Sequence, residues 1–204
     1  MSSGPYRYGT HGIGIKRHTQ TVMLKLTNGG HLLGQGLGTL VGLVTAFVIT
    51  FIIMTFGIYM PENLVSSAIV SDFLSYTDLE LRLAVVGTIL YPSAFGFTSL
   101  GSIVGFGASG ATVLMFLAWG TGGLVAGLLS KDFLPGILAG VFAAVMGSFL
   151  IWLLFFMISP GASITGIFDP ASLLLMEAAL EGSIYPAIAA AIGGILGGGI
   201  TRDR

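Results

Sequence analysis

The sequence of 204 residues contains no cysteine. This absence excludes disulfide bonds, thiolate metal sites and cysteine nucleophiles. Charge is also scarce: charged residues make up 8% of the chain, against about 25% in a typical soluble domain, whereas hydrophobic residues make up 54%. The net charge of −1 gives no basis for expecting nucleic acid as a partner. The composition therefore excludes an ordinary water-soluble globule.

Long apolar runs are what the sequence has instead. Four stretches, 32–60, 83–129, 134–158 and 183–200, contain no charged residue. Because about 20 apolar residues in a helix cross the hydrocarbon core of a bilayer, each run is long enough to span it. We predict an all-α, multipass integral protein of the cell membrane whose first partner is the lipid bilayer.

The positive charges predict the orientation of the chain in the membrane. Basic residues at membrane edges favour the cytoplasmic side, so the basic N-terminal segment is expected in the cytoplasm. The loops around 61–82 and 159–182 are mainly acidic and are expected outside. We take as topology anchors the basic residues Arg7, Lys16, Arg17, Lys131, Arg202 and Arg204.

Four crossings satisfy this charge distribution. The expected helices cover about 32–60, 108–129, 134–158 and 183–200. The chain then divides into a cytoplasmic basic tail (1–30), a first membrane hairpin (31–132) and a second membrane hairpin (133–204).

The two hairpins end on similar sequences. Residues 122–132 read GGLVAGLLSKD and residues 193–203 read GGILGGGITRD, a match with a period of about 71. The similarity predicts an internal repeat of two hairpins in parallel orientation, each ending at the cytoplasmic face.

The apolar segment 83–107 has no counterpart in the second hairpin. Its Pro and Gly residues predict a broken or re-entrant element, for which Pro92, Ser93, Thr98 and Ser99 are the candidate pore-lining residues. If this segment crosses the membrane instead, the chain has five crossings and its C-terminus lies outside. A second similarity, ILYP at 89–92 and SIYP at 183–186, favours that alternative and an inverted repeat.

Small residues recur four positions apart in each expected helix, within a chain that is rich in glycine. Such faces let helix backbones approach closely in lipid. We expect them to pack the helices on one another, with one face left for oligomer contacts. The predicted packing glycines are Gly34, Gly38, Gly42, Gly123, Gly127, Gly136, Gly140, Gly194 and Gly198. The Ser and Thr hydroxyls of these helices are expected to bond to their own backbone.

Three local signals refine the loops. Thr77 to Glu80 fits a capping box that opens a helix. Asp169 followed by Pro170 fits an N-cap and a first helical residue, opening a helix that carries Glu177 and Glu181 on one face. Pro186 is expected to kink the last helix.

The sequence contains no recognisable catalytic, cofactor or metal motif, and the spanning runs carry no charged residue of the kind that usually marks a transport site. The sequence therefore favours a non-enzymatic membrane protein that acts as a packing or assembly subunit of a homo-oligomer or a larger membrane complex. The alternative is a small-solute channel or transporter subunit in which 83–107 lines the path. An intramembrane enzyme is the third and least favoured interpretation.

Overall fold

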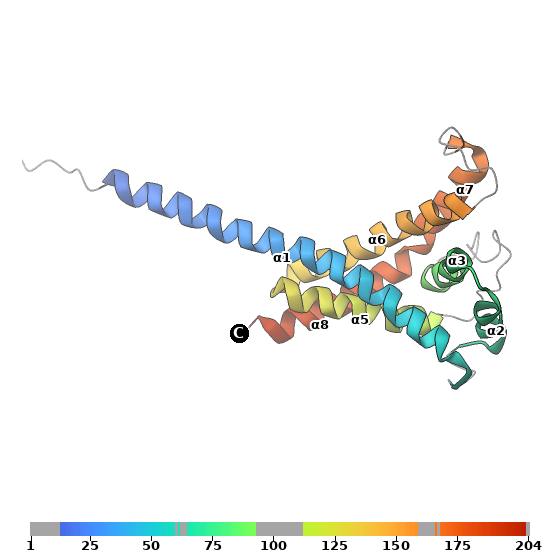
Figure 1. Ribbon diagram of the computed structural model, residues 1–204. Helices are drawn as coiled ribbons and strands as arrows, with labels where there is room; N and C mark the ends of the chain where they lie inside the picture. The colour runs from blue at the N-terminus through green and yellow to red at the C-terminus, as the bar shows by residue number, and fades with distance from the viewer. Residues whose placement is uncertain are drawn as a thin grey trace, which may run out of the picture. The chain divides into compact units, whose positions relative to one another are not determined.

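The computed structural model describes the backbone of residues 13–59, 61, 65–92, 112–158, 166 and 168–202. Side chains are described for 34–59, 61, 65–92, 113–158, 166 and 168–202. Within these ranges every regular element is a helix (Figure 1). The all-α class expected from the sequence is therefore confirmed.

The chain divides into two units, Met1–Leu33 and Gly34–Arg204. The backbone of residues 13–33 in the first unit is the initial part of helix α1 (Ile13–Thr55), which continues into the second unit. The second unit then contains the helices η1 (Gly57–Tyr59), α2 (Ser67–Ser75), α3 (Leu79–Leu90), α5 (Thr112–Ser130), α6 (Phe133–Ile158), α7 (Pro170–Gly182) and α8 (Ile184–Thr201).

Four helical stretches are long and apolar enough to cross a membrane. They are Gly34–Thr55, Val113–Ser130, Phe133–Ile158 and Pro170–Thr201, close to the four expected from the sequence. The first helix begins at Ile13, much earlier than the expected start near residue 32. The prediction missed this part because hydropathy identifies only the apolar part of a helix. The last stretch also includes α7, so it carries Glu177 and Glu181 in addition to the apolar residues of α8.

The short helices α2 and α3 run crosswise to the long helices. In Figure 1 both are seen nearly along their axes, at the end of the second unit where α1 finishes. Helix α3 covers the first part of the predicted segment 83–107 and ends before Pro92, because proline disfavours a helical residue in front of it. At about 1.5 Å per residue its twelve residues extend only about 18 Å, too short to cross a bilayer.

Both helices with predicted N-caps start where the sequence indicated, but neither N-cap side chain forms the expected hydrogen bond. Helix α3 starts where the capping box was expected, but its N-cap is Asp78 and not Thr77, and no side-chain cap hydrogen bond forms. Helix α7 has Asp169 as N-cap and Pro170 at its first position, as expected, again without a side-chain bond.

The last membrane-length stretch is interrupted between α7 and α8 at Ser183. Pro186 accounts for the interruption, since it has no N–H to donate to the carbonyl oxygen of Gly182 four positions earlier. The kink expected at Pro186 therefore occurs about one turn before it.

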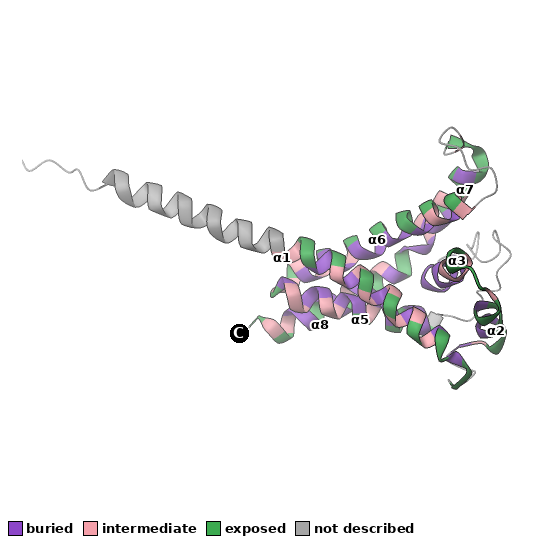
Figure 2. Ribbon diagram, viewed as in Figure 1, coloured by how far each residue is buried: buried purple, intermediate pink, exposed green. Residues whose placement is uncertain are grey.

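Hydroxyl groups on the membrane-length helices bond to their own backbone, as the sequence predicted. Thr50 donates to the carbonyl oxygen of Ala46 at 3.0 Å, although the side chain is fully buried. The same bond within one helix is made by Thr39, Thr45, Thr55, Thr121 and Ser148. Buried residues lie where the helices face one another, and exposed residues line their outer sides (Figure 2).

Candidate functional site

Close backbone contact joins α1 to α5. At Gly38, a Cβ atom would stand 2.8 Å from the carbonyl oxygen of Ala126; at Gly42, it would stand 2.8 Å from that of Gly122. One turn earlier, Gly34 faces the carbonyl oxygen of Leu129. As residue numbers rise along α1 they fall along α5, so the two helices are antiparallel.

The helices α6 and α8 meet in the same way. At Gly136, a Cβ atom would stand 2.8 Å from the carbonyl oxygen of Gly194, and at Gly140 it would stand 2.7 Å from that of Ala190. Gly198 faces the carbonyl oxygen of Asp132 near the start of α6. These helices form a second antiparallel pair, again built on glycines four residues apart.

A parallel contact between α5 and α8, here called the α5–α8 seam, links the two pairs. Gly123 faces the carbonyl oxygen of Ala190 and Gly127 faces that of Gly194. In return, Gly193 faces the carbonyl oxygen of Gly120, and Gly197 faces that of Leu124. Each of these glycines would place a Cβ atom inside the partner backbone. These four positions of the seam therefore cannot accommodate any side chain.

The α5–α8 seam has a reciprocal register. Gly123 of α5 contacts residue 190 of α8. Adding 70 to the α5 number and subtracting 70 from the α8 number gives residues 193 and 120, which are also in contact. The same shift relates the contacts of Gly127 and Gly197. The contacts thus pair the helices with an offset of 70, one less than the 71 that aligns the letters GGLVAGLLSKD and GGILGGGITRD.

All nine predicted packing glycines lie in contacts between helices. Gly34, Gly38 and Gly42 face α5; Gly123 and Gly127 face α8; Gly136 and Gly140 face α8; Gly194 and Gly198 face α6. Gly193 and Gly197, which the sequence places beside Gly194 and Gly198 on the last helix, also lie in contacts between helices, facing α5. Among the described glycines of α1, Gly36 is the one with no atom within 4 Å of an added Cβ.

Tyr91 fills the centre of the second unit. This side chain, immediately after α3, is fully buried, and its hydroxyl donates to the carbonyl oxygen of Ala144 on α6 at 2.8 Å. Its ring lies 5.6 Å from the ring of Trp119 on α5. The indole N–H of Trp119 donates in turn to the carbonyl oxygen of Leu90 at 3.2 Å. The last residues of α3 are thereby fastened to both α5 and α6.

The Tyr91 hydroxyl reaches deep into the bundle. From the first residue of α6, Phe133, the helix rises about 16 Å to Ala144 at ~1.5 Å per residue. That distance is about half of the ~30 Å hydrocarbon core of a bilayer. Gly147 makes room for the hydroxyl, and Leu43 of α1 borders the same space. The centre of the bundle is therefore occupied by packed side chains in the part of the chain that the structure describes.

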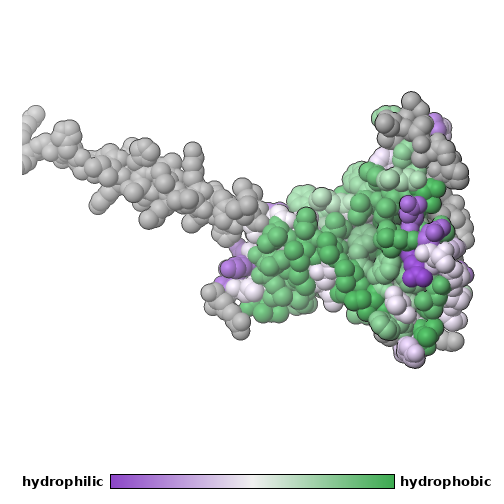
Figure 3. Space-filling view, in the orientation of Figure 1, coloured by the Kyte–Doolittle hydropathy of each residue, from purple (hydrophilic) through white to green (hydrophobic). Residues whose placement is uncertain are grey.

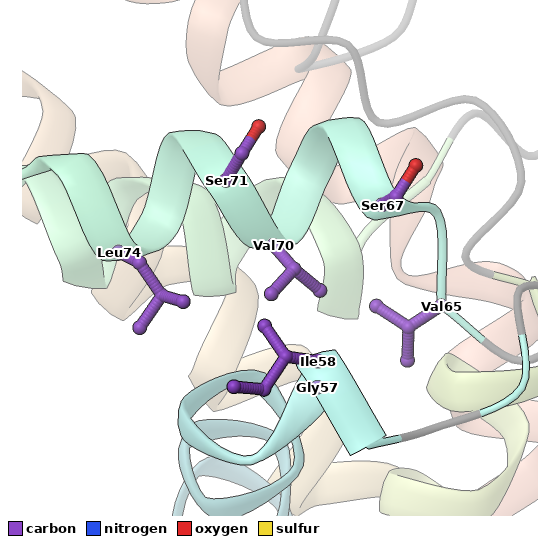
Figure 4. Close-up of a pocket in the computed structure, with 7 residues that line it drawn as sticks. All are labelled: Gly57, Ile58, Val65, Ser67, Val70, Ser71 and Leu74. Atoms are coloured by element: carbon purple, nitrogen blue, oxygen red, sulfur yellow. The ribbon is translucent and has the colours of Figure 1, made fainter.

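An apolar pocket lies away from this centre, between α2 and η1 (Figure 4). Its volume is about 320 Å³. The lining residues are Gly57, Ile58, Val65, Ser67, Val70, Ser71 and Leu74. The Ser71 hydroxyl already donates to the carbonyl oxygen of Ala68, so the pocket offers mainly hydrocarbon contacts.

Charged residues gather at the two ends of the second unit, with a hydrophobic surface between them (Figure 3). Lys131 and Arg202, both exposed, follow α5 and α8 at one end. At the other end Arg82 donates from Nε to the carbonyl oxygen of Tyr76 at 2.7 Å and lies 5.4 Å from the ring centre of Phe73. Arg82 thus holds α2 and α3 together.

Several predicted residues lie outside the description. Of the candidate pore-lining set, Pro92 is described and half-buried after α3, whereas Ser93, Thr98 and Ser99 lie outside the described residues. Of the topology anchors, Arg7 and Arg204 also lie outside, and only the backbone is described for Lys16 and Arg17.

The described residues contain no group of three or more His, Asp or Glu side chains placed to hold a metal ion. Glu177 is exposed on α7 and Glu181 is half-buried one turn later. No protein-family model, no curated protein and no solved structure matches this chain. The site must therefore be interpreted from its own geometry.

Proposed function

We propose that this chain is a non-enzymatic membrane protein that acts as a packing or assembly subunit of a homo-oligomer or a larger membrane complex. The observation that carries the proposal is the filled interior. Tyr91, Trp119 and Ile151 are fully buried at the centre, and glycine backbones meet across the α5–α8 seam. A bundle packed in this way is suited to act as a rigid structural subunit within lipid.

Exposed apolar residues lie on the outer faces of α1, α6 and α8, and we propose the outer face of α1 as the surface for a partner. Gly36 has open space around it, and the exposed apolar residues that share this side of the helix are Leu37, Leu40, Val44, Val48 and Ile52. The glycine faces of the other helices are already used within the chain. A partner subunit is therefore expected to contact α1.

Gly36 and Gly38 provide a matched pair of variants. Gly36→Leu adds a side chain where nothing lies within 4 Å, so the fold is expected to survive while contact with a partner on α1 is blocked. Gly38→Leu places the same side chain against the backbone of Ala126 and is expected to disrupt the α1–α5 contact itself.

Native mass spectrometry of the chain extracted with its surrounding lipid tests the proposal. We expect the wild type as an oligomer or with a bound membrane partner, and Gly36→Leu as a folded single copy. A wild-type chain that is a monomer without any co-purifying membrane protein contradicts the proposal.

The parallel repeat and the orientation belong to the same proposal. We propose that α1 with α5 and α6 with α8 are duplicated hairpins whose basic ends, at Lys131 and Arg202, face the cytoplasm in the cell membrane. The parallel direction of α5 and α8 supports the duplication, although their reciprocal contacts are offset by 70 residues and the repeat by 71; the positions of the basic residues support the orientation. Reporter fusions after Arg204 test the orientation; an external reporter contradicts it.

A second candidate function is a small-solute channel or transporter subunit. One observation bears on it: Tyr91, at the end of α3, blocks the centre of the bundle, through which a path would have to run. Replacing Tyr91 by alanine in vesicles loaded with a small polar solute tests it. Faster release than from wild-type vesicles supports a path, and equal release contradicts one.

A further inference from the structure

We infer that the end of the bundle at Lys131 and Arg202 binds the phosphate headgroup of an anionic phospholipid. The inference does not depend on the assembly function proposed above. It begins with the α5–α8 seam, which is parallel and so brings the last residues of α5 and α8 to the same end. An antiparallel contact would place the two basic residues at opposite ends.

Arg202 is held in place before any ligand binds. Its guanidinium carbon lies 5.0 Å from the ring centre of Phe133, a cation–π contact that limits the freedom of the side chain. Phe133 in turn packs against Gly199, where an added Cβ would stand 3.0 Å from the ring. Less conformational freedom is then lost when an anion binds.

Lys131 is presented by the turn between α5 and α6. Its φ of 58° is left-handed, and its backbone N–H bonds to the carbonyl oxygen of Gly127 at 3.0 Å, so the chain reverses within two residues. The side chain is exposed. Both basic groups therefore lie beside the first turn of α6, whose N-terminal end favours negative charge.

The nearby acidic side chain is engaged elsewhere. Asp132 accepts a hydrogen bond from the backbone N–H of Phe133 at 2.8 Å, as a cap of α6. Among the described residues, neither Lys131 nor Arg202 forms an ion pair with a carboxylate. A phosphate from the adjacent leaflet is the anion that this position favours, because basic clusters at membrane surfaces attract anionic lipid.

Native mass spectrometry of the full chain tests the inference, after reconstitution in phosphatidylcholine with added phosphatidylglycerol. We expect retained phosphatidylglycerol on the wild type. In the double variant Lys131→Gln and Arg202→Gln, affinity should fall roughly 25-fold, since each basic residue near an anionic surface contributes about a factor of five. The charge-conserving variant Lys131→Arg with Arg202→Lys should retain the lipid.

Two further measurements separate loss of lipid binding from loss of the fold. The thermal midpoint in pure phosphatidylcholine should fall only slightly in the double Gln variant, since it loses the contact of Arg202 with Phe133. Phe133→Leu, which keeps both charges, should bind phosphatidylglycerol several-fold more weakly. Equal lipid retention by the wild type and the double Gln variant overturns the inference. Complete displacement of the lipid by millimolar inorganic phosphate also overturns it, because the site would then be one for free phosphate.

Discussion

Gly123 and Gly193 occupy reciprocal positions across the α5–α8 seam. Each faces the carbonyl oxygen of the residue three positions before the other, Ala190 for Gly123 and Gly120 for Gly193. Because both contacts are between backbones, neither helix can yield by turning a side chain away. The two glycines therefore meet a similar steric constraint.

Replacing either glycine by alanine should therefore destabilise the bundle by a similar amount. We expect about 2 kcal/mol for Gly123→Ala and for Gly193→Ala, the usual range for overpacking a close contact. Gly36→Ala, with open space around it, should be neutral or slightly stabilising, since alanine favours a helix. Unfolding by denaturing detergent measures all three. A large effect at only one seam glycine contradicts the reciprocal packing.

Cysteine cross-linking measures the register of the seam directly, because the chain has no cysteine of its own. Gly193 faces Gly120 and Gly197 faces Leu124, so the next turn should bring Thr201 beside Leu128. The pair Leu128→Cys and Thr201→Cys should form a disulfide within one chain under mild oxidation. The pair Leu128→Cys and Ile192→Cys is the control, displaced by about 13 Å along α8. Equal cross-linking of the two pairs contradicts the parallel register.

Tyr91 should contribute both a hydrogen bond and packing volume. Tyr91→Phe removes only the hydroxyl bond to Ala144 and should cost about 1 kcal/mol. Tyr91→Ala also leaves a cavity and should cost about 3–5 kcal/mol. Tyr59→Phe is the matched control, since Tyr59 is 82% exposed. Stability and tryptophan fluorescence in a Trp152→Phe background, which leaves Trp119 as the one fluorophore, report the change. No difference between Tyr91→Ala and the control contradicts a packed centre.

The turn at Lys131 should carry backbone strain. A non-glycine residue in the left-handed region costs about 1–2 kcal/mol, so Lys131→Gly should stabilise the fold by about 1 kcal/mol. Lys131→Ala removes the same charge and keeps the strain, so it separates the two effects. Thermal unfolding in phosphatidylcholine provides the comparison. If the two variants are equally stable, the turn is not strained.

Arg82 should fasten α2 to α3. Arg82→Leu removes the bond to the Tyr76 carbonyl oxygen and the contact with the Phe73 ring, and should loosen both short helices by about 1–2 kcal/mol. Glu80→Gln, at an exposed position of α3, is the control. Hydrogen exchange of the amides in 67–90 measures the loosening. Unchanged exchange in Arg82→Leu contradicts this role.

The sequence by itself determined the all-α class and the positions of the four membrane-length helices found among the described residues. Hydropathy and charge belong to each segment alone, so the runs at 134–158 and 183–200 predicted α6 and α8 to within about a residue. Hydroxyl bonding within helices was likewise a local property. The start of α1 at Ile13 was missed because hydropathy does not mark a helix whose residues are polar.

Only the tertiary structure decided which surfaces meet. Gly36 and Gly38 are the same residue type two positions apart, yet one faces open space and the other faces the backbone of α5. A glycine carries no side chain that would specify a partner, so the steric fit of whole helices selects the contact. The same holds for Tyr91. Its sequence neighbours predict a broken helix, but only the packing of α3, α5 and α6 brings its hydroxyl beside Gly147 and within reach of the carbonyl oxygen of Ala144.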